Sequence, residues 1–330
     1  MVVKILSDLG ERAAIQRIAA VLTKGTNRSG IGDDCAAIDM GKEYLLATTD
    51  MMYQQTHIPA QMTPYQMGWF LVAMNLSDIA AKGGTPLGLL LSFGLPKKTT
   101  ELFLTELTKG ADACAVAFGT TIVGGDTKET QEITLCGTAF GTVKKDEFMS
   151  RTGAHPGDIV AVTGTLGRAG AGYYVLKHHT FEKKLSKALL EPVPKLKEGR
   201  LLAQQRFVTS SMDLSDGLSA SLYQLQELNN VGFEIKKNVL PLASELCELC
   251  RKNDGIDPYS LALHFGGDYE LLVTVPQPRF EQTKKMLKKH GVDLTGIGLV
   301  TKKKDIVLVE NGNKQILENK GYEHFKKHNF

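Results

Sequence analysis

The order of the expected strands and helices is the strongest constraint on what this chain can fold into. In the first half, apolar patterning predicts helices over 7–22, 64–81 and 101–118 and strands over 44–48, 87–95, 120–123 and 133–143. In the second half, it predicts helices over 170–177, 197–206, 218–229, 243–252 and 279–290 and strands over 159–163, 269–275, near 299 and over 306–310. This order lacks strict strand–helix–strand alternation, which favours an α+β architecture in each half.

The length of the chain favours two domains. Its 330 residues exceed the size at which a single hydrophobic core usually stops growing. Hydrophobic residues make up 42% and charged residues 23%, so the chain can bury a core and is not disordered. The segment Ser150–Asp158 is rich in glycine and proline and predicts a boundary, with domains at 1–149 and 150–330.

Charge and cysteine usage exclude several classes of protein. The net charge is only +3, and the excess of basic residues lies after residue 278, so we expect no nucleic-acid partner. The five cysteines are odd in number and scattered, and the pair Cys247 and Cys250 is more typical of a packed helix face than of a metal site. The chain has neither a signal-peptide pattern nor an apolar run of spanning length. We therefore expect a cytoplasmic protein without a membrane partner.

Aspartates at the ends of the expected elements carry the chemical signal. Most of them stand beside glycine, serine or threonine, where a short carboxylate can project into a cleft. The set is Asp33, Asp34, Asp50, Asp78, Asp126, Asp213, Asp216 and Asp268. Several converging carboxylates, without matching cysteines or histidines, suit Mg²⁺ and its phosphate ligands.

Each aspartate taken alone is more typical of a turn or a helix cap. Only the full set of aspartates indicates a ligand-binding site. Asp78 is an exception, because it lies within a mostly apolar helix and must be paired, solvated or metal-bound. No P-loop or protein-kinase motif occurs in the sequence. The segment GTLGRAGAG at 164–172 could cradle phosphate on its backbone N–H groups, but helix–strand packing explains it equally well.

Eight short motifs occur in an order that resembles a known family. They are GIGDDCA (30–36), TTD (48–50), NLSDIAA (75–81), GGDT (124–127), SRTGAHPGD (150–158), DLSDGL (213–218), GGDYELL (266–272) and GYEHF (321–325). Together they resemble thiamine-monophosphate kinase, of the superfamily that includes aminoimidazole ribonucleotide synthetase and selenophosphate synthetase. The resemblance implies two α/β domains, an N-terminal one whose mixed or antiparallel sheet forms a homodimer and a C-terminal α/β sandwich. It also implies ATP-dependent phosphorylation of thiamine monophosphate to thiamine diphosphate, the last step of its biosynthesis, with several Mg²⁺ ions.

The resemblance also assigns roles to individual residues. The metal ligands that it implies are Asp33, Thr49, Asp50, Asp78, Asp126, Asp213 and Asp216. The nucleotide contacts that it implies are Gly125, Asp126, Arg151 and Ser215, of which Asp126 and Arg151 are the expected catalytic residues. On the substrate side, the resemblance implies His57 and Tyr322. The family often has a further acid where this chain has Gly267, and we expect Asp268 to take over that role.

The expected chemistry is direct in-line transfer of the ATP γ-phosphoryl group to the phosphate of thiamine monophosphate. Neutralising and positioning two anions should dominate catalysis, with Arg151 as a fixed cation, and the acceptor phosphate needs no strong general base. Three alternatives stay open: another ATP-using enzyme of the superfamily, a two-metal phosphohydrolase, and a non-catalytic ATP·Mg²⁺ sensor. A selenophosphate enzyme would carry a reactive cysteine near the N-terminus, and no cysteine precedes Cys35.

Overall fold

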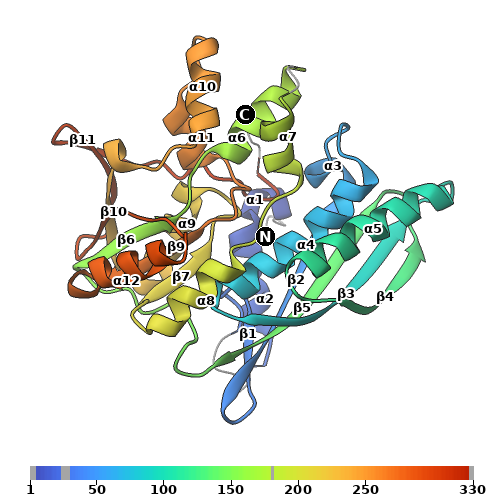
Figure 1. Cartoon of the computed structure of the whole chain (residues 1–330), viewed down its shortest axis with the longest axis horizontal. Coiled ribbons are helices and arrows are strands. Elements are labelled where there is room, and N and C mark those ends of the chain that lie inside the picture. The colour runs from blue at the N-terminus through green and yellow to red at the C-terminus, as the bar shows by residue number, and fades with distance from the viewer. Residues whose placement is uncertain (1–4, 24–29, 180–181, 327–330) are drawn as a thin grey trace.

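The computed structural model describes residues 5–23, 30–179 and 182–326, which form two mixed sheets and the helices around them (Figure 1). The expected α+β architecture with two sheet-containing halves is confirmed. None of the described helices is long and apolar enough to cross a membrane. All five cysteines are free thiols.

The N-terminal sheet has five strands in the order β1-β2-β5-β3-β4. The strands are β1 (Ala36–Asp39), β2 (Glu43–Tyr53), β3 (Thr85–Leu95), β4 (Ile122–Glu129) and β5 (Thr134–Lys144). All neighbours pair antiparallel except β3 and β4, which are parallel. Figure 1 shows α4 (Pro64–Ala81) and α5 (Glu101–Ala117) side by side across one face of this sheet. Burial alternates along β5, because successive side chains point to opposite faces and the helices cover only one of them.

Helix α4 is the central element of the fold. Its N-terminus is defined by a capping box, in which Thr63 accepts from the Gln66 N–H and Pro64 fills the first helical position. Its end at Ala81 is followed by Gly83 with φ +69°, a backbone conformation that glycine adopts without strain. Twelve of its 18 residues are buried, as the nearly uniform apolar pattern of 64–81 predicts.

The C-terminal sheet has seven strands in the order β12-β11-β8-β10-β6-β9-β7. The strands are β6 (Asp158–Thr163), β7 (Ser210–Asp213), β8 (Gly232–Lys236), β9 (Leu271–Pro276), β10 (Leu294–Thr301), β11 (Ile306–Glu310) and β12 (Asn313–Ile316). The helices of this half are α6 (Arg168–Lys177), α7 (Lys183–Leu190), α8 (Leu196–Gln205), α9 (Leu218–Asn229), α10 (Ser244–Lys252), α11 (Pro258–His264) and α12 (Gln277–Lys289). Pairing is antiparallel except between β8 and β11.

The two halves share a hydrophobic core along α4. Leu71 and Leu76 of α4 belong to one buried cluster with Leu202 of α8 and Val273 of β9. The approach is close enough that a Cβ at Gly199 of α8 would lie 2.1 Å from the Ala80 carbonyl oxygen. The last turns of α4 are therefore held against both sheets, and any polar side chain there lies at the junction of the two halves.

Three expectations about local structure are wrong. The helix expected over 7–22 is divided at Gly10, whose φ of +79° ends α1 (Leu6–Leu9) before α2 (Glu11–Val21) begins. The strand expected over 44–48 continues as β2 to Tyr53, because every residue from 43 to 53 pairs with β5. The expected loop 124–127 lies inside β4, where Gly125 allows close approach to β3: a Cβ there would lie 1.8 Å from the Leu91 carbonyl oxygen.

Candidate active site

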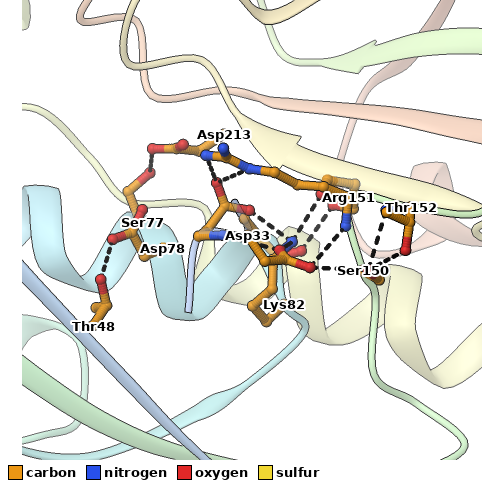
Figure 2. A network of polar contacts seen from close by, with 12 residues as sticks. Asp33, Thr48, Ser77, Asp78, Lys82, Ser150, Arg151, Thr152 and Asp213 are labelled. Carbon is orange, nitrogen blue, oxygen red and sulfur yellow. Dashed lines mark hydrogen bonds and ion pairs between the residues drawn. The ribbon is translucent and has the colours of Figure 1, made fainter. Parts of the chain in front are cut away.

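A cluster of aspartates lies where the two halves meet (Figure 2). Asp34 comes from the loop before β1, Asp78 from the last turn of α4 and Asp213 from the end of β7. One carboxylate oxygen from each lies within 4.8 Å of the other two. The packing of α4 between the sheets thus brings together residues that are up to 179 positions apart.

Neighbouring side chains fix the orientation of this triad. The Thr48 hydroxyl donates to Asp78 Oδ2 at 2.5 Å, and the Ser77 hydroxyl donates to Asp213 Oδ2 at 2.7 Å. The Arg151 guanidinium donates from Nε to Asp34 Oδ1 at 2.8 Å. Each carboxylate is therefore held by at least one donor, while the set still concentrates negative charge in one buried place.

The pKa values report this concentrated charge. Burial, followed by the charge of Asp34, raises the pKa of Asp213 to about 7. Burial, followed by the charge of Asp216, raises the pKa of Asp50 to about 6, and burial with the charge of Asp50 raises the pKa of Asp78 well above its usual value. These carboxylates lack sufficient positive charge nearby, which a divalent cation with oxygen ligands would supply. The donor set therefore fits Mg²⁺.

Asp33 differs from its neighbour Asp34, although the two are equivalent in the sequence pattern. Its carboxylate accepts from Lys82 Nζ at 2.6 Å, from the Ser150 hydroxyl at 2.9 Å and from the Arg151 N–H at 3.2 Å. Burial opposes its ionisation, but Lys82 and these hydrogen bonds lower its pKa to about 2. Asp34 also contacts Lys82 and Arg151, but unlike Asp33 it has a carboxylate oxygen close to those of Asp78 and Asp213. The aspartate set expected from the sequence includes Asp34, but the resemblance implied a ligand role for Asp33 and not for Asp34.

Three further residues of the expected set, Arg151, Ser215 and Asp216, border the triad. Arg151 also donates to Gln224 Oε1 at 3.1 Å, and the same Gln224 donates to Asp216 Oδ2 at 3.3 Å. Ser215, between Asp213 and Asp216, accepts from the Gly267 N–H at 2.8 Å through its carbonyl oxygen. Asp50, Asp213, Asp216, Arg151 and Ser215 thus lie at or beside the cluster; their ligand and nucleotide roles stay predictions.

Thr49 lies on the other face of the N-terminal sheet. Its hydroxyl donates to the Gly137 carbonyl oxygen at 2.9 Å and lies 3.4 Å from Cys136 Sγ. Side chains alternate along β2, so Thr48 rather than Thr49 presents its hydroxyl to the aspartates. Sequence reasoning placed the end of the strand at this point and therefore could not decide which threonine faces inward.

Gly125 and Asp126 are not brought into the cluster of the same chain. They lie on the edge strand β4, and the pairing register runs from Asp50 through Gly137 and Leu91 to Gly125. Three interstrand steps separate the two ends of this row, about 14 Å at about 4.8 Å each. Asp126 is exposed and forms an ion pair with Lys128 at 3.2 Å.

The expected substrate residues His57 and Tyr322 gather around His324. The ring of His324 lies 5.3 Å from that of His57 and 4.8 Å from that of Tyr322, centroid to centroid. Burial, with a smaller effect of His324, lowers the pKa of His57 to about 4, so that its ring is neutral at physiological pH. Sequence reasoning missed His324, although it lies in the same GYEHF motif as Tyr322.

Asp268 caps helix α6. Its carboxylate accepts from the Gly167 N–H at 2.5 Å and from the Ala169 N–H at 2.9 Å, while burial raises its pKa to about 6. Two backbone donors of the segment GTLGRAGAG are therefore already bound by a carboxylate, which favours the packing explanation of this segment over a phosphate cradle. A substrate contact of Asp268 stays a prediction.

Comparison with known proteins identifies the class that this fold and site define. Residues 32–143 match the AIR synthase related protein N-terminal domain, and residues 155–311 match the corresponding C-terminal domain. The chain is 36% identical to thiamine-monophosphate kinase of Methanospirillum hungatei, covering 88% of this chain and 92% of the relative. It is 34% identical to that of Pyrococcus horikoshii, covering 90% and 91%. The chain belongs to the thiamine-monophosphate kinase family, as the motifs indicate.

Solved structures agree with this assignment. AaThiL complexed with AMPPCP and TMP superimposes with a TM-score of 0.87 at 30% identity, covering 98% of this chain and 100% of that chain. Thiamine-monophosphate kinase from Aquifex aeolicus gives 0.78 at 28% identity, covering 94% and 99%. The hydrogenase maturation protein HypE of Escherichia coli gives 0.71 at 23% identity, covering 83% and 85%, and shows the shared fold alone.

Proposed function

We propose that this protein transfers the γ-phosphoryl group of ATP to thiamine monophosphate and forms thiamine diphosphate, the last step of thiamine diphosphate biosynthesis. The observation that carries the proposal is the triad of buried Asp34, half-buried Asp78 and buried Asp213, in a chain that superimposes along 98% of its length on a relative bound to AMPPCP and TMP. AMPPCP is an analogue of ATP, so that relative holds a nucleotide and a phosphorylated acceptor together. The reaction class is that of a kinase with a phosphate group as acceptor.

Several Mg²⁺ ions would be held by Asp34, Asp50, Asp78 and Asp213, with Asp216 beside them. The raised pKa values of Asp50, Asp78 and Asp213 support this inference, because they record negative charge that the nearby Arg151 balances only in part. Bound Mg²⁺ would neutralise phosphate oxygens and so allow two anionic ligands to share one site. Asp34 is thus added to the ligands expected from the sequence. Asp33 instead accepts from Lys82, Ser150 and the Arg151 N–H, and so holds these segments in place.

Other residues of the site would bind and position the two substrates. Arg151 lies beside the triad with its guanidinium held by Asp34 and Gln224, so it can present a fixed positive charge to a phosphate. Ser215, on the loop between Asp213 and Asp216, would contact the nucleotide. His57 and Tyr322 offer neutral aromatic surface for the rings of the acceptor. The acceptor phosphate is already ionised, and no general base is required.

A homodimer would complete the site. Asp126 points away from the helices on the open face of the N-terminal sheet, because it is in register with Met51, the residue that follows Asp50. On that face Met51 is 56% and Leu90 38% exposed, which is apolar surface that a second copy can cover. Pairing of two such faces would let Asp126 and Gly125 of one subunit approach the nucleotide of the other. The division into domains at 1–149 and 150–330 is part of the same proposal, with the first domain forming the dimer.

One experiment tests the proposed reaction. The purified protein is incubated with ATP, Mg²⁺ and thiamine monophosphate, and the products are identified by mass spectrometry. We expect ADP and thiamine diphosphate in equal amounts. Release of inorganic phosphate without acceptor would instead indicate a phosphohydrolase, and nucleotide binding without turnover would indicate a sensor.

A matched pair of variants connects the reaction to the triad. Asp34→Asn should lower the rate by at least roughly 100-fold, because it removes a ligand of the metal-binding set. The control Asp39→Asn changes an exposed aspartate of β1 whose carboxylate contacts Lys145 and the Gly41 N–H at the surface. Its rate should stay within about twofold of the unmodified protein. Equal activity of both variants would contradict the proposed site.

A further inference from the structure

Lys82 is a completely buried ammonium group beside the aspartate triad. It is the residue that directly follows α4, and it is the largest fully buried side chain among the described residues, with 0% exposure. A lysine is almost never fully buried unless its charge is paired. Its position, one turn of helix after Asp78, places it between the two halves of the fold (Figure 2).

The contacts of Lys82 join three separate segments. Its Nζ lies 2.6 Å from Asp33 Oδ1 and 2.6 Å from Asp34 Oδ2, both in the loop before β1. It donates to the carbonyl oxygen of Ser211 on β7 at 2.9 Å. Two of its three N–H donors are used in the hydrogen bonds to Asp33 and Ser211, and the contact with Asp34 is an ion pair. Lys82 is therefore directed toward protein groups.

The charge of this side chain is maintained in spite of its burial. Burial lowers the pKa of Lys82, but the charges of Asp34 and Asp33 outweigh that effect and keep its pKa above the usual value. The ammonium and the two carboxylates are mutually dependent, because an isolated charge at such a depth would be expensive.

We propose that Lys82 is a built-in counter-ion that positions Asp34 in the triad and balances its charge before any metal binds. Lys82 is thus a positioning residue, since it touches Asp34 and not the reacting groups. The inference rests on the proposed metal-binding role of the triad. A consequence is that the fold tolerates the acidic site in the absence of metal, and that loss of Lys82 makes folding depend on divalent cations.

The test measures thermal stability and needs no substrate. Lys82→Met keeps much of the buried side-chain volume but removes the charge, leaving Asp33 and Asp34 without their shared cation. In EDTA, the Tm of this variant should fall by on the order of 10 °C, the size expected for breaking a buried ion pair in a chain of this length. Saturating Mg²⁺ should raise the Tm of Lys82→Met by at least about twice as many degrees as it raises that of the unmodified protein, because the metal replaces part of the missing charge.

Lys195→Met is the matched control. Lys195 forms an ion pair at 3.1 Å with the buried carboxylate of Glu270, outside the triad. Its loss should lower the Tm in EDTA but leave the Mg²⁺-induced increment equal to that of the unmodified protein. The same increment in Lys82→Met and Lys195→Met would overturn the proposal, as would a Mg²⁺ increment absent from all three proteins.

A double variant separates charge from packing, and covers the case in which Lys82→Met does not fold in EDTA. Asp34→Asn with Lys82→Met removes the carboxylate that the cation balances together with the cation, so a substantial part of the lost Tm should return. A double variant as unstable as the single one would overturn the proposal, because the loss would then come from packing. The product assay is independent of these measurements: absence of thiamine diphosphate would refute the proposed reaction while the Tm comparison still decides the role of Lys82.

Discussion

Asp50 and Asp126 point to opposite faces of the same five-stranded sheet. Across the sheet, Asp50 is in register with Gly137, Leu91 and Gly125. Asp126 is one residue further along and is in register with Met51, so it shares the outward face of Met51 and not the inward face of Asp50. No side-chain rotation can bring the two carboxylates to one site within a single chain, because the sheet itself lies between them. A site that uses both residues needs two copies of the chain.

Complementation between two inactive variants follows from this arrangement. Asp50→Asn and Asp126→Asn should each be nearly inactive alone, but a mixed dimer contains one site in which both aspartates are intact. Co-expressed chains that assemble at random should then recover about a quarter of the activity of the unmodified protein, as expected for a twofold-symmetric dimer. The measurement is the activity of the co-expressed mixture and of tagged, purified mixed dimers, for which the expected recovery is about half because one of their two sites is intact. No recovery in a verified mixed dimer would show that Asp126 does not act across the interface.

The metal-free protein should become more stable as the pH falls from 8 to 6. The pKa of Asp213 is raised to about 7 and that of Asp50 to about 6 in the folded chain, against a usual value of 3.8. A raised carboxylate pKa means that the folded state binds protons more readily than the unfolded state, so protonation below the folded pKa favours folding. The Tm in EDTA should therefore rise by several degrees over this range. Differential scanning calorimetry at matched ionic strength checks this, and a Tm that falls toward pH 6 would contradict it.

Asp213→Asn should raise the thermal stability of the metal-free protein and lower its activity. The substitution keeps an oxygen that can accept from Ser77 but removes a buried charge that Asp34 and Asp50 repel. We expect a Tm in EDTA at pH 8 that is higher by a few degrees, a smaller Mg²⁺-induced increment and a loss of activity of at least roughly 100-fold. Thermal melts with and without Mg²⁺, together with the product assay, measure all three. A Tm below that of the unmodified protein would argue against charge repulsion in the triad.

His57 should act through its ring and not through its charge. Its pKa of about 4 keeps the imidazole neutral at physiological pH, and it is packed near His324. His57→Phe should keep the KM for thiamine monophosphate within about threefold, whereas His57→Ala should raise it by about tenfold through loss of aromatic contact. The KM for ATP serves as the internal control and should change in neither variant. Equal effects of phenylalanine and alanine would show that a polar contact of the ring matters instead.

Local pattern predicts α4 and the segments that carry the aspartates. The bounds of α4 follow from Thr63, Pro64 and the glycines after Ala81, which act within a few residues of the chain. The aspartates stand at junctions where small neighbours leave room for a ligand, and the order of the motifs indicates the family. None of these inferences depends on a contact between distant segments.

Tertiary contacts decide which member of each adjacent pair reaches the site. Asp33 and Asp34 are equivalent in the pattern, yet Asp33 accepts from Ser150 and the Arg151 N–H, while only Asp34 has an oxygen close to those of Asp78 and Asp213. The continuation of β2 past Thr48 assigns the inward position to that residue and the outward one to Thr49.

The sequence by itself determined the kinds of groups that this protein brings to its site: many carboxylates, one fixed arginine and aromatic rings near the end of the chain. Only the tertiary structure decided which oxygens meet, and it turned Lys82, an unremarkable residue after a helix, into the buried partner of two aspartates. The physical reason is that strand alternation and helix packing set the direction of a side chain, and both depend on partners far away along the chain.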